Sequence, residues 1–257
     1  MYFDYFDMLS GKPLLVEGVG RVRSPFLHEL CPRDNGVPSR IVYNAYVSIL
    51  TWEKSAILKY ICEIRPSASK ILNRPELSAF DVATIWPDTR GLYREALSFF
   101  IVEDLIWDGS QRHYKVVDKN GSVVGYVNRD NFDKVREILL QMNYIGLEKS
   151  SAPISHSSKA SKNLWELAQK RMNELSRNNA KKDKPEYHLS NIISKVCSIH
   201  PSYNLFNIYD LTVFQLYDTF FQLGYIRSSN ISERIFCHHG GDKFKFENWL
   251  KPIFKNI

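Results

Sequence analysis

The sequence has few cysteines and no long apolar run. Four cysteines in 257 residues are too few for a disulfide scaffold. The longest apolar candidate, residues 96–106, is interrupted by Glu103 and Asp104 and falls short of the ~20 residues that span a bilayer. Residues 1–4 include an acid where a secretory signal carries bases. We therefore expect a cytoplasmic protein with free thiols and no membrane partner.

Sequence motifs of catalysis are also absent. The sequence contains no P-loop, no zincin pair, no nucleophile elbow and no dinucleotide-binding fingerprint. The pair Gly18 and Gly20 lacks the third glycine of that fingerprint, and a bent ribbon is the favoured interpretation. We therefore expect no enzyme activity and no cofactor.

One group of residues has metal-ligand chemistry. Cys237, His238 and His239, together with Cys197 and His200, could supply four zinc ligands. However, Cys197 lies on an apolar helical stripe, where a free cysteine usually packs as a small buried hydrophobe. Adjacent histidines on a helix also point in different directions. We expect no metal site, although the sequence leaves open whether the Cys237–His239 cluster binds one.

Apolar residues make up 44% of the chain and recur at helical spacing over most of it. This content suffices for one large domain or two small ones. Helices are predicted over residues 25–30, 39–61, 77–86, 88–100, 189–196 and from Phe132 onward. The stretch 39–61 is either one helix with a break near Thr51 or two helices. The predicted N-caps are Ser24 for the first helix, Asp88 for residues 88–100, and Asp130 or Asn131 for the helix from Phe132.

The middle of the chain has a β pattern. Residues 112–117 and 122–127 flank a turn that ends in Asn120 and Gly121, which is typical of a type I′ hairpin. A bent ribbon is predicted over residues 14–22. The predicted fold class is therefore mainly α with a small antiparallel β-hairpin element at about 101–128, an α+β protein with helical bundle-like halves.

The C-terminal part contains clear helix signals. Thr212 and Gln215 have the spacing of a capping box, and Gly224 is predicted to end the helix that begins there. Asn230 and Glu233 predict a second box, and a last short helix is predicted around Trp249.

The predicted domains are residues 1–145 and 163–257, joined by a Ser-rich linker at 146–162. Residues 159–184 contain eight bases and three acids, so this segment has a net charge of +5 in a chain of net charge +6. A solvated helix face is favoured over a nucleic-acid patch, because Trp165 is the segment's sole aromatic residue. The basic residues of that candidate patch are Lys170, Arg171, Arg177, Lys181, Lys182 and Lys184.

The run Asn207–Asp218, with the sequence NIYDLTVFQLYD, resembles a helix near the end of a group of bacteriophage proteins. These proteins, from phages and prophages of Gram-positive hosts, are described as tail assembly chaperones or as tail-region proteins of unknown role. The stretches Val16–Leu27, Tyr43–Leu50 and Asn128–Asn143 resemble other parts of the group in the same order. Cys237–Gly241 departs from it, because a turn of small residues is expected there.

The resemblance implies a protein of tail morphogenesis in the host cytoplasm, a chaperone that binds the tape measure or tail tube protein. The alternatives are a minor structural component of the tail or connector in the virion, and a nucleic-acid-binding protein acting through residues 159–184. The sequence leaves open whether the protein also forms homo-oligomers. Core packing is favoured over partner contact for the aromatic candidates at helical spacing. The candidate partner-binding residues are Tyr43, Tyr46, Phe214, Tyr217, Phe221 and Tyr225.

Overall fold

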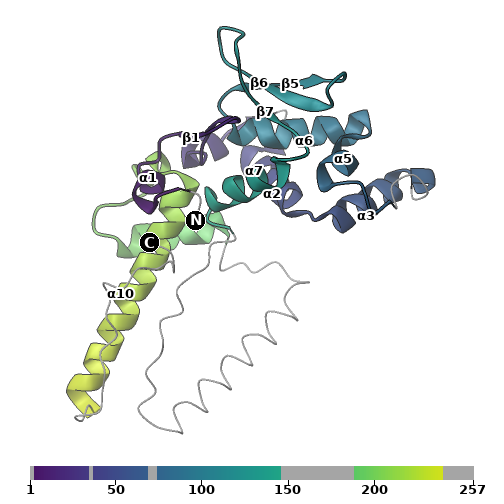
Figure 1. Cartoon of the computed structure of the whole chain (residues 1–257). Helices are drawn as coiled ribbons and strands as arrows, with labels where there is room; N and C mark the ends of the chain where they lie inside the picture. The colour runs from purple at the N-terminus through teal and green to yellow at the C-terminus, as the bar shows by residue number, and fades with distance from the viewer. Residues whose placement is uncertain (1–2, 35–36, 69–73, 146–187, 240–257) are drawn as a thin grey trace. The chain divides into compact units, whose positions relative to one another are not determined.

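The computed structural model of the chain describes residues 3–34, 37–68, 74–145 and 188–239. This part is mainly helical with small antiparallel sheets, so the predicted fold class is confirmed (Figure 1). The helices are α1 Tyr5–Leu9, α2 Ser39–Thr51, α3 Lys54–Ile64, α5 Ala79–Thr84, α6 Pro87–Phe100, α7 Phe132–Gln141, α9 Leu189–Ile199 and α10 Val213–His239. The strands are β1 Leu14–Val16, β2 Gly20–Val22, β3 Arg33–Asp34, β4 Val37–Pro38, β5 Asp104–Asp108, β6 His113–Val117 and β7 Val123–Val127.

The chain divides into two compact units. The first comprises residues 1–147 and the short segment 209–215, and the second comprises residues 148–208 and 216–257. The predicted linker at 146–162 and the basic segment lie outside the described residues. The predicted domain boundaries therefore stay a prediction. Within the described residues, none of the helices has the length and apolar character needed to cross a membrane.

The first unit is built on a cluster of buried aromatic rings. Phe80 contacts Phe132 and Tyr114 at centroid distances of 5.2 and 6.1 Å, and Tyr93 contacts Phe132 at 5.7 Å. All four side chains are at most 2% exposed. Edge-to-face pairs of this kind contribute about 0.5–1.5 kcal/mol each beyond the burial of their area. Burial raises the pKa of the Tyr93 and Tyr114 hydroxyls, which both donate to main-chain carbonyls.

Two helices, α2 and α3, occupy residues 39–64, which confirms the two-helix alternative for this stretch. Arg136, a residue of α7 that is only 9% exposed, stabilises the break between them. Its guanidinium donates to the carbonyl of Leu50 at 2.9 Å and to that of Trp52. Arg136 thereby satisfies carbonyls at the end of α2 that have no partner within the helix.

Two predicted helix starts differ in detail from the structure. The N-cap of α6 is Trp86, with Pro87 in the first turn, so the prediction of Asp88 as cap is wrong. Proline suits this position because its missing N–H would lack a helical partner there anyway. Asn131 precedes α7 as predicted, but its side chain accepts a hydrogen bond from the Asn128 N–H and makes no cap hydrogen bond.

The sheet β5-β6-β7 contains the predicted hairpin, but the predicted turn type is wrong. A type I′ turn needs positive φ at both central residues, and in this turn only Gly121 has it, with a φ of 82°. The Gly121 N–H donates to the Asp118 carbonyl at 3.0 Å, and the Asp118 N–H donates to the Ser122 carbonyl at 2.9 Å. The Asp118 carboxylate also accepts from the Asn120 and Ser122 amides. These bonds favour a loop that is longer than a two-residue turn.

The ribbon β1-β2 is fixed against the sheet by a close approach of two backbones. The Tyr126 N–H donates to the Gly18 carbonyl at 2.8 Å. A Cβ atom at Gly125 would lie 2.5 Å from that carbonyl oxygen, so only glycine fits at this point. Glu103, with a side chain 6% exposed, accepts from the Arg21 N–H and from Arg21 Nε at 2.8 and 2.7 Å. The bent ribbon predicted for residues 14–22 is thus present as a hairpin.

Ser24 does not cap the helix that follows it. The structure has a short 3-10 turn at Leu27–Leu30, so the prediction of a helix starting at Pro25 under a Ser24 cap is wrong. Ser24 is 3% exposed, and its hydroxyl oxygen accepts the N–H of Phe214 at 3.1 Å. The Pro25 carbonyl accepts the Val213 N–H at 2.9 Å. Ser24 therefore caps the first turn of α10 by accepting the N–H of a residue 190 positions later.

The predicted capping box at the start of α10 is confirmed. The Gln215 N–H donates to the Thr212 hydroxyl at 3.2 Å, and the Thr212 N–H donates to the Gln215 side-chain oxygen at 2.8 Å. The amides of residues 212–215, which a helix leaves without internal partners, are thus all hydrogen-bonded.

Gly224 lies inside α10, which continues to His239, so the predicted helix end at Gly224 is wrong. The predicted second box at Asn230 and Glu233 is wrong for the same reason, because both residues lie within the helix. The predicted helix around Trp249 lies outside the described residues.

Replacing Ser24 with alanine should lower the free energy of unfolding by about 1–3 kcal/mol, because it leaves the buried Phe214 N–H without an acceptor. Chemical denaturation followed by circular dichroism measures this change. Ser98→Ala, on the exposed side of α6, is the matched control and should change stability by less than about 0.5 kcal/mol. Equal stability of Ser24→Ala and the wild type would contradict this role.

Replacing Gly224 with alanine should stabilise the protein by up to about 1 kcal/mol, because alanine is the better helix former and no atom within 4 Å obstructs its Cβ. The matched variant is Gly121→Ala, whose Cβ is equally unobstructed but whose φ is positive. Thermal denaturation of both variants should shift in opposite directions. A destabilised Gly224→Ala would mean that the helix ends there.

Candidate functional site

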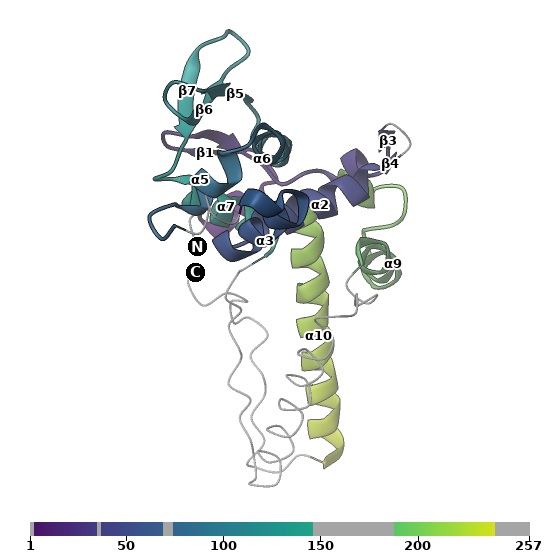
Figure 2. The ribbon, with the colours of Figure 1, turned by 90° about the vertical axis from the view of Figure 1, so that its right-hand side faces the viewer.

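The first part of the connection between α9 and α10, residues 200–208, stands out on the second unit. Helix α9 buries Ile192 and Val196 and ends at Ile199, directly before His200 and Pro201. The residue that precedes a proline is driven out of the helical conformation, which explains why α9 ends here. Figure 2 shows this connection in green, following α9.

Side chains of the connection fold back onto its own backbone. The Asn204 side-chain oxygen accepts the Phe206 N–H, and the Asn207 side-chain oxygen accepts the Asn204 N–H, both at 2.8 Å. Asn207 Nδ2 donates to the Ser202 carbonyl at 2.9 Å, and the Ile208 N–H donates to the Asn204 carbonyl at 3.0 Å. These bonds give residues 202–208 a defined turn conformation.

The turn presents two large apolar side chains to solvent. Phe206 is 97% exposed and Leu205 is 61% exposed, whereas Ile208 is fully buried. Single exposed apolar side chains are common on protein surfaces. Here a leucine and a phenylalanine are adjacent, and the turn that carries them is ordered by its hydrogen bonds. We call residues Ser202–Asn207 the Leu205–Phe206 loop.

The Leu205–Phe206 loop and its flanks carry no formal charge. Residues 200–209 contain no aspartate, glutamate, lysine or arginine. The nearest charged residues along the chain are Lys195 and Asp210. His200 Nδ1 accepts the Ser202 N–H at 3.2 Å, and its ring lies 4.5 Å from that of Tyr203. The surface offered here is therefore apolar and aromatic, with neutral polar flanks.

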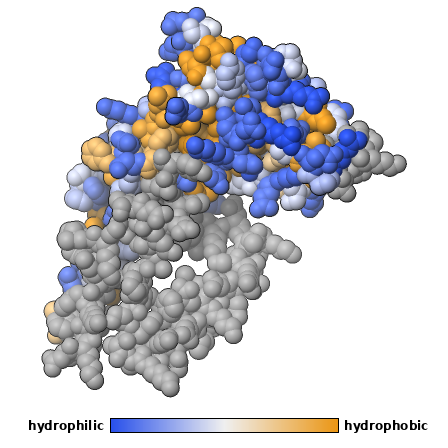
Figure 3. Space-filling model, in the orientation of Figure 1, coloured by the Kyte–Doolittle hydropathy of each residue, from blue (hydrophilic) through white to orange (hydrophobic). Residues whose placement is uncertain are grey.

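The outer face of the sheet β5-β6-β7 is a second apolar surface, on the first unit. Its register places Ile106, Lys115 and Tyr126 in one cross-strand row, with Val124 nearby on β7. Ile106 is 53% exposed, and Tyr126 and Val124 are 42% and 44% exposed. Hydrophobic residues are visible on the upper part of the space-filling view, where the sheet lies (Figure 3). Lys115 crosses this face to Asp108 at 2.7 Å, and its hydrogen bond lowers the pKa of that carboxyl group.

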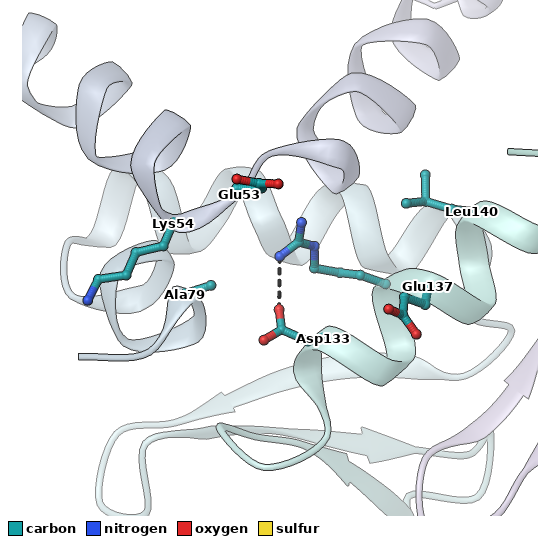
Figure 4. A pocket seen from close by; sticks show the side chains of 7 residues that line it. Glu53, Lys54, Ala79, Asp133, Glu137 and Leu140 are labelled. Carbon is teal, nitrogen blue, oxygen red and sulfur yellow. Dashed lines mark hydrogen bonds and ion pairs between the residues drawn. The ribbon is translucent and has the colours of Figure 1, made fainter. Parts of the chain in front are cut away.

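An open pocket of about 450 Å³ lies between the starts of α3 and α5 and the side of α7 (Figure 4). Acidic side chains of Glu53, Asp133 and Glu137 line it. Arg136 also lines it, but this side chain is committed to the α2 carbonyls and to Asp133 at 3.0 Å. Within the described residues, no three or more histidine, cysteine or acidic side chains form a group that could hold a metal ion.

Two of the six predicted partner-binding aromatics lie in the core of the first unit. Tyr43 is 4% exposed and its hydroxyl donates to the Asn143 side chain at 3.2 Å, while Phe214 is fully buried against the rings of Tyr5 and Tyr144. The other four are partly exposed, namely Tyr46, Tyr217, Phe221 and Tyr225. Burial raises the pKa of the Tyr217 hydroxyl. Partner binding by this set stays a prediction.

Most of the other predicted site residues lie outside the part of the chain that the structure describes. All six residues of the basic patch lie outside the described residues, as do the side chains of His238 and His239. Cys197 is partly buried, which raises the pKa of its thiol, whereas Cys237 is exposed. Leu205 and Phe206 were not predicted. The sequence contains a signal for them, because Asn204 and Asn207 are turn formers that bracket the pair.

Replacing Asn207 with alanine should loosen the Leu205–Phe206 loop, because it removes two of the hydrogen bonds that fix the turn. Hydrogen exchange at the Asn204 amide should become faster, while the free energy of unfolding changes by less than about 1 kcal/mol. Asn44→Ala, at an exposed position of α2, is the matched control and should leave this exchange unchanged. An unchanged Asn204 exchange rate in Asn207→Ala would show that these bonds do not order the loop.

Comparison with protein-family models gives a match to part of the chain. Residues 179–254 match the family model described as the YomV second domain, of a family associated with phages and prophages. No curated protein and no solved structure matches the chain. The matched segment contains the Leu205–Phe206 loop and the start of α10. The predicted resemblance to phage proteins is confirmed for this segment at that level, and the more specific assignment to tail assembly chaperones stays a prediction.

Proposed function

We propose that this chain is a phage or prophage protein that binds another phage-encoded protein chain while the tail is assembled. The observation that carries the proposal is the exposed pair Leu205 and Phe206, which lies inside the segment that matches a phage-associated family. Aromatic side chains, phenylalanine among them, are enriched at the cores of protein–protein interfaces relative to the rest of the surface.

The partners that fit this role best are the tape measure and tail tube proteins. A tape measure chain is long and helical, and its apolar stripes associate when they are left uncovered. A protein that covers such a stripe until the tail polymerises acts as an assembly chaperone. The partly exposed aromatics Tyr217 and Phe221 on α10 add apolar contact area of the type that receives a partner helix.

A structural role in the virion uses the same kind of contact and differs in its duration. A chaperone leaves its partner before the particle is complete, whereas a minor tail or connector component remains bound. The two roles are therefore separated by the composition of the mature particle.

An affinity-tagged full-length chain, expressed in phage-producing cells, tests the proposal. Mass spectrometry should find a tail protein of the same phage enriched over the untagged control after nuclease treatment. The chain itself should be missing from purified virions. Its presence there at stoichiometric levels would identify a structural component, and enrichment of no phage protein would contradict the proposal.

A further inference from the structure

We infer that the Leu205–Phe206 loop is the anchor of the proposed complex and that it enters an uncharged, apolar pocket on a protein partner. The inference rests on the proposed function and adds which surface binds and what chemistry receives it. The loop meets the structural requirement for an anchor. Its tip side chains are exposed, and the Asn204 and Asn207 side chains fix its backbone.

The lack of charged residues near the loop determines which kind of pocket can receive it. Burying Phe206 would also desolvate its neighbours, and residues 200–209 contain no aspartate, glutamate, lysine or arginine to pair with a charged partner group. An ionised group in the pocket would therefore be buried without a counter-ion, which is strongly unfavourable. The receiving surface must then be apolar, with neutral hydrogen-bonding groups at most. Binding through such a contact depends little on ionic strength.

The lack of basic residues in the loop also disfavours a lipid surface or a nucleic acid as its binding partner. Stable membrane binding by a few inserted apolar side chains needs a second signal, usually basic residues beside them, and the loop has none. Nucleic acids are bound through lysine and arginine contacts to phosphates, which the loop also lacks. The binding partner that fits the loop is therefore a protein with an apolar pocket.

Photo-crosslinking in phage-producing cells tests which surface binds. A benzophenone amino acid placed at position 206 of the full-length chain should crosslink to a phage tail protein. Phe6 is the matched control position, because it is the same residue type, is 78% exposed and lies on the first unit. Equal crosslinking of that tail protein from both positions, or crosslinking from position 6 alone, would overturn the inference.

Affinity measurements with the purified tail protein test the chemistry. Phe206→Ala should weaken binding by about 30-fold or more, as expected for an interface hot spot, and Phe206→Leu by less. Phe6→Ala should bind like the wild type, and unchanged circular dichroism spectra would establish that all variants are folded. Raising the salt concentration from 0.05 to 0.5 M should change the wild-type affinity less than about twofold.

Each result decides between the inference and an alternative. Wild-type affinity for Phe206→Ala would overturn the loop as the anchor, and a steep loss of binding with salt would overturn the uncharged pocket. Binding to vesicles of phosphatidylglycerol and phosphatidylethanolamine that requires Phe206 would also overturn the inference, in favour of a lipid surface. If a tail protein is recovered equally well by Phe206→Ala, only this inference fails. If no tail protein is recovered at all, the proposed function fails with it.

Discussion

The pairing of residues 24–27 with residues 211–214 is the interaction on which the architecture depends. Ser24 and Pro25 accept the first amides of α10, and the Leu27 N–H donates to the Leu211 carbonyl at 2.9 Å. The Phe214 side chain is fully buried in the first unit. A buried amide without a partner costs about 1–3 kcal/mol, so each segment stabilises the other.

This pairing has a consequence for the segment that matches the YomV second domain. Residues 209–215 lie within that match, yet they belong to the first compact unit. The matched segment is thus not self-contained in this chain, because its longest described helix starts on hydrogen bonds supplied by residues 24 and 25. The Leu205–Phe206 loop also lies within the match, and it belongs to the second unit, where its tip side chains are exposed.

Local signals in the sequence were sufficient where the partners of a residue lie a few positions away. The Thr212–Gln215 box forms as predicted because both groups share one helical turn. Ser24 has an equally good N-cap signal, but its hydroxyl binds an amide 190 residues away, which no local pattern specifies. Gly224 resembles a helix end locally, yet α10 continues through it to His239, because one glycine costs a helix only about 1 kcal/mol relative to alanine. The exposed pair Leu205 and Phe206 was missed because apolar residues in sequence are first assigned to the core.

Amide hydrogen exchange at Val213 and Phe214 tests whether residues 24–27 and 211–214 are paired in solution. The first amides of a helix normally exchange fast, because they have no partner within the helix. We expect these two amides to exchange as slowly as the core of the first unit, since Pro25 and Ser24 accept them in a buried environment. Exchange at the rate of an unpaired helix start would contradict the pairing, because the two segments would then not be joined in solution.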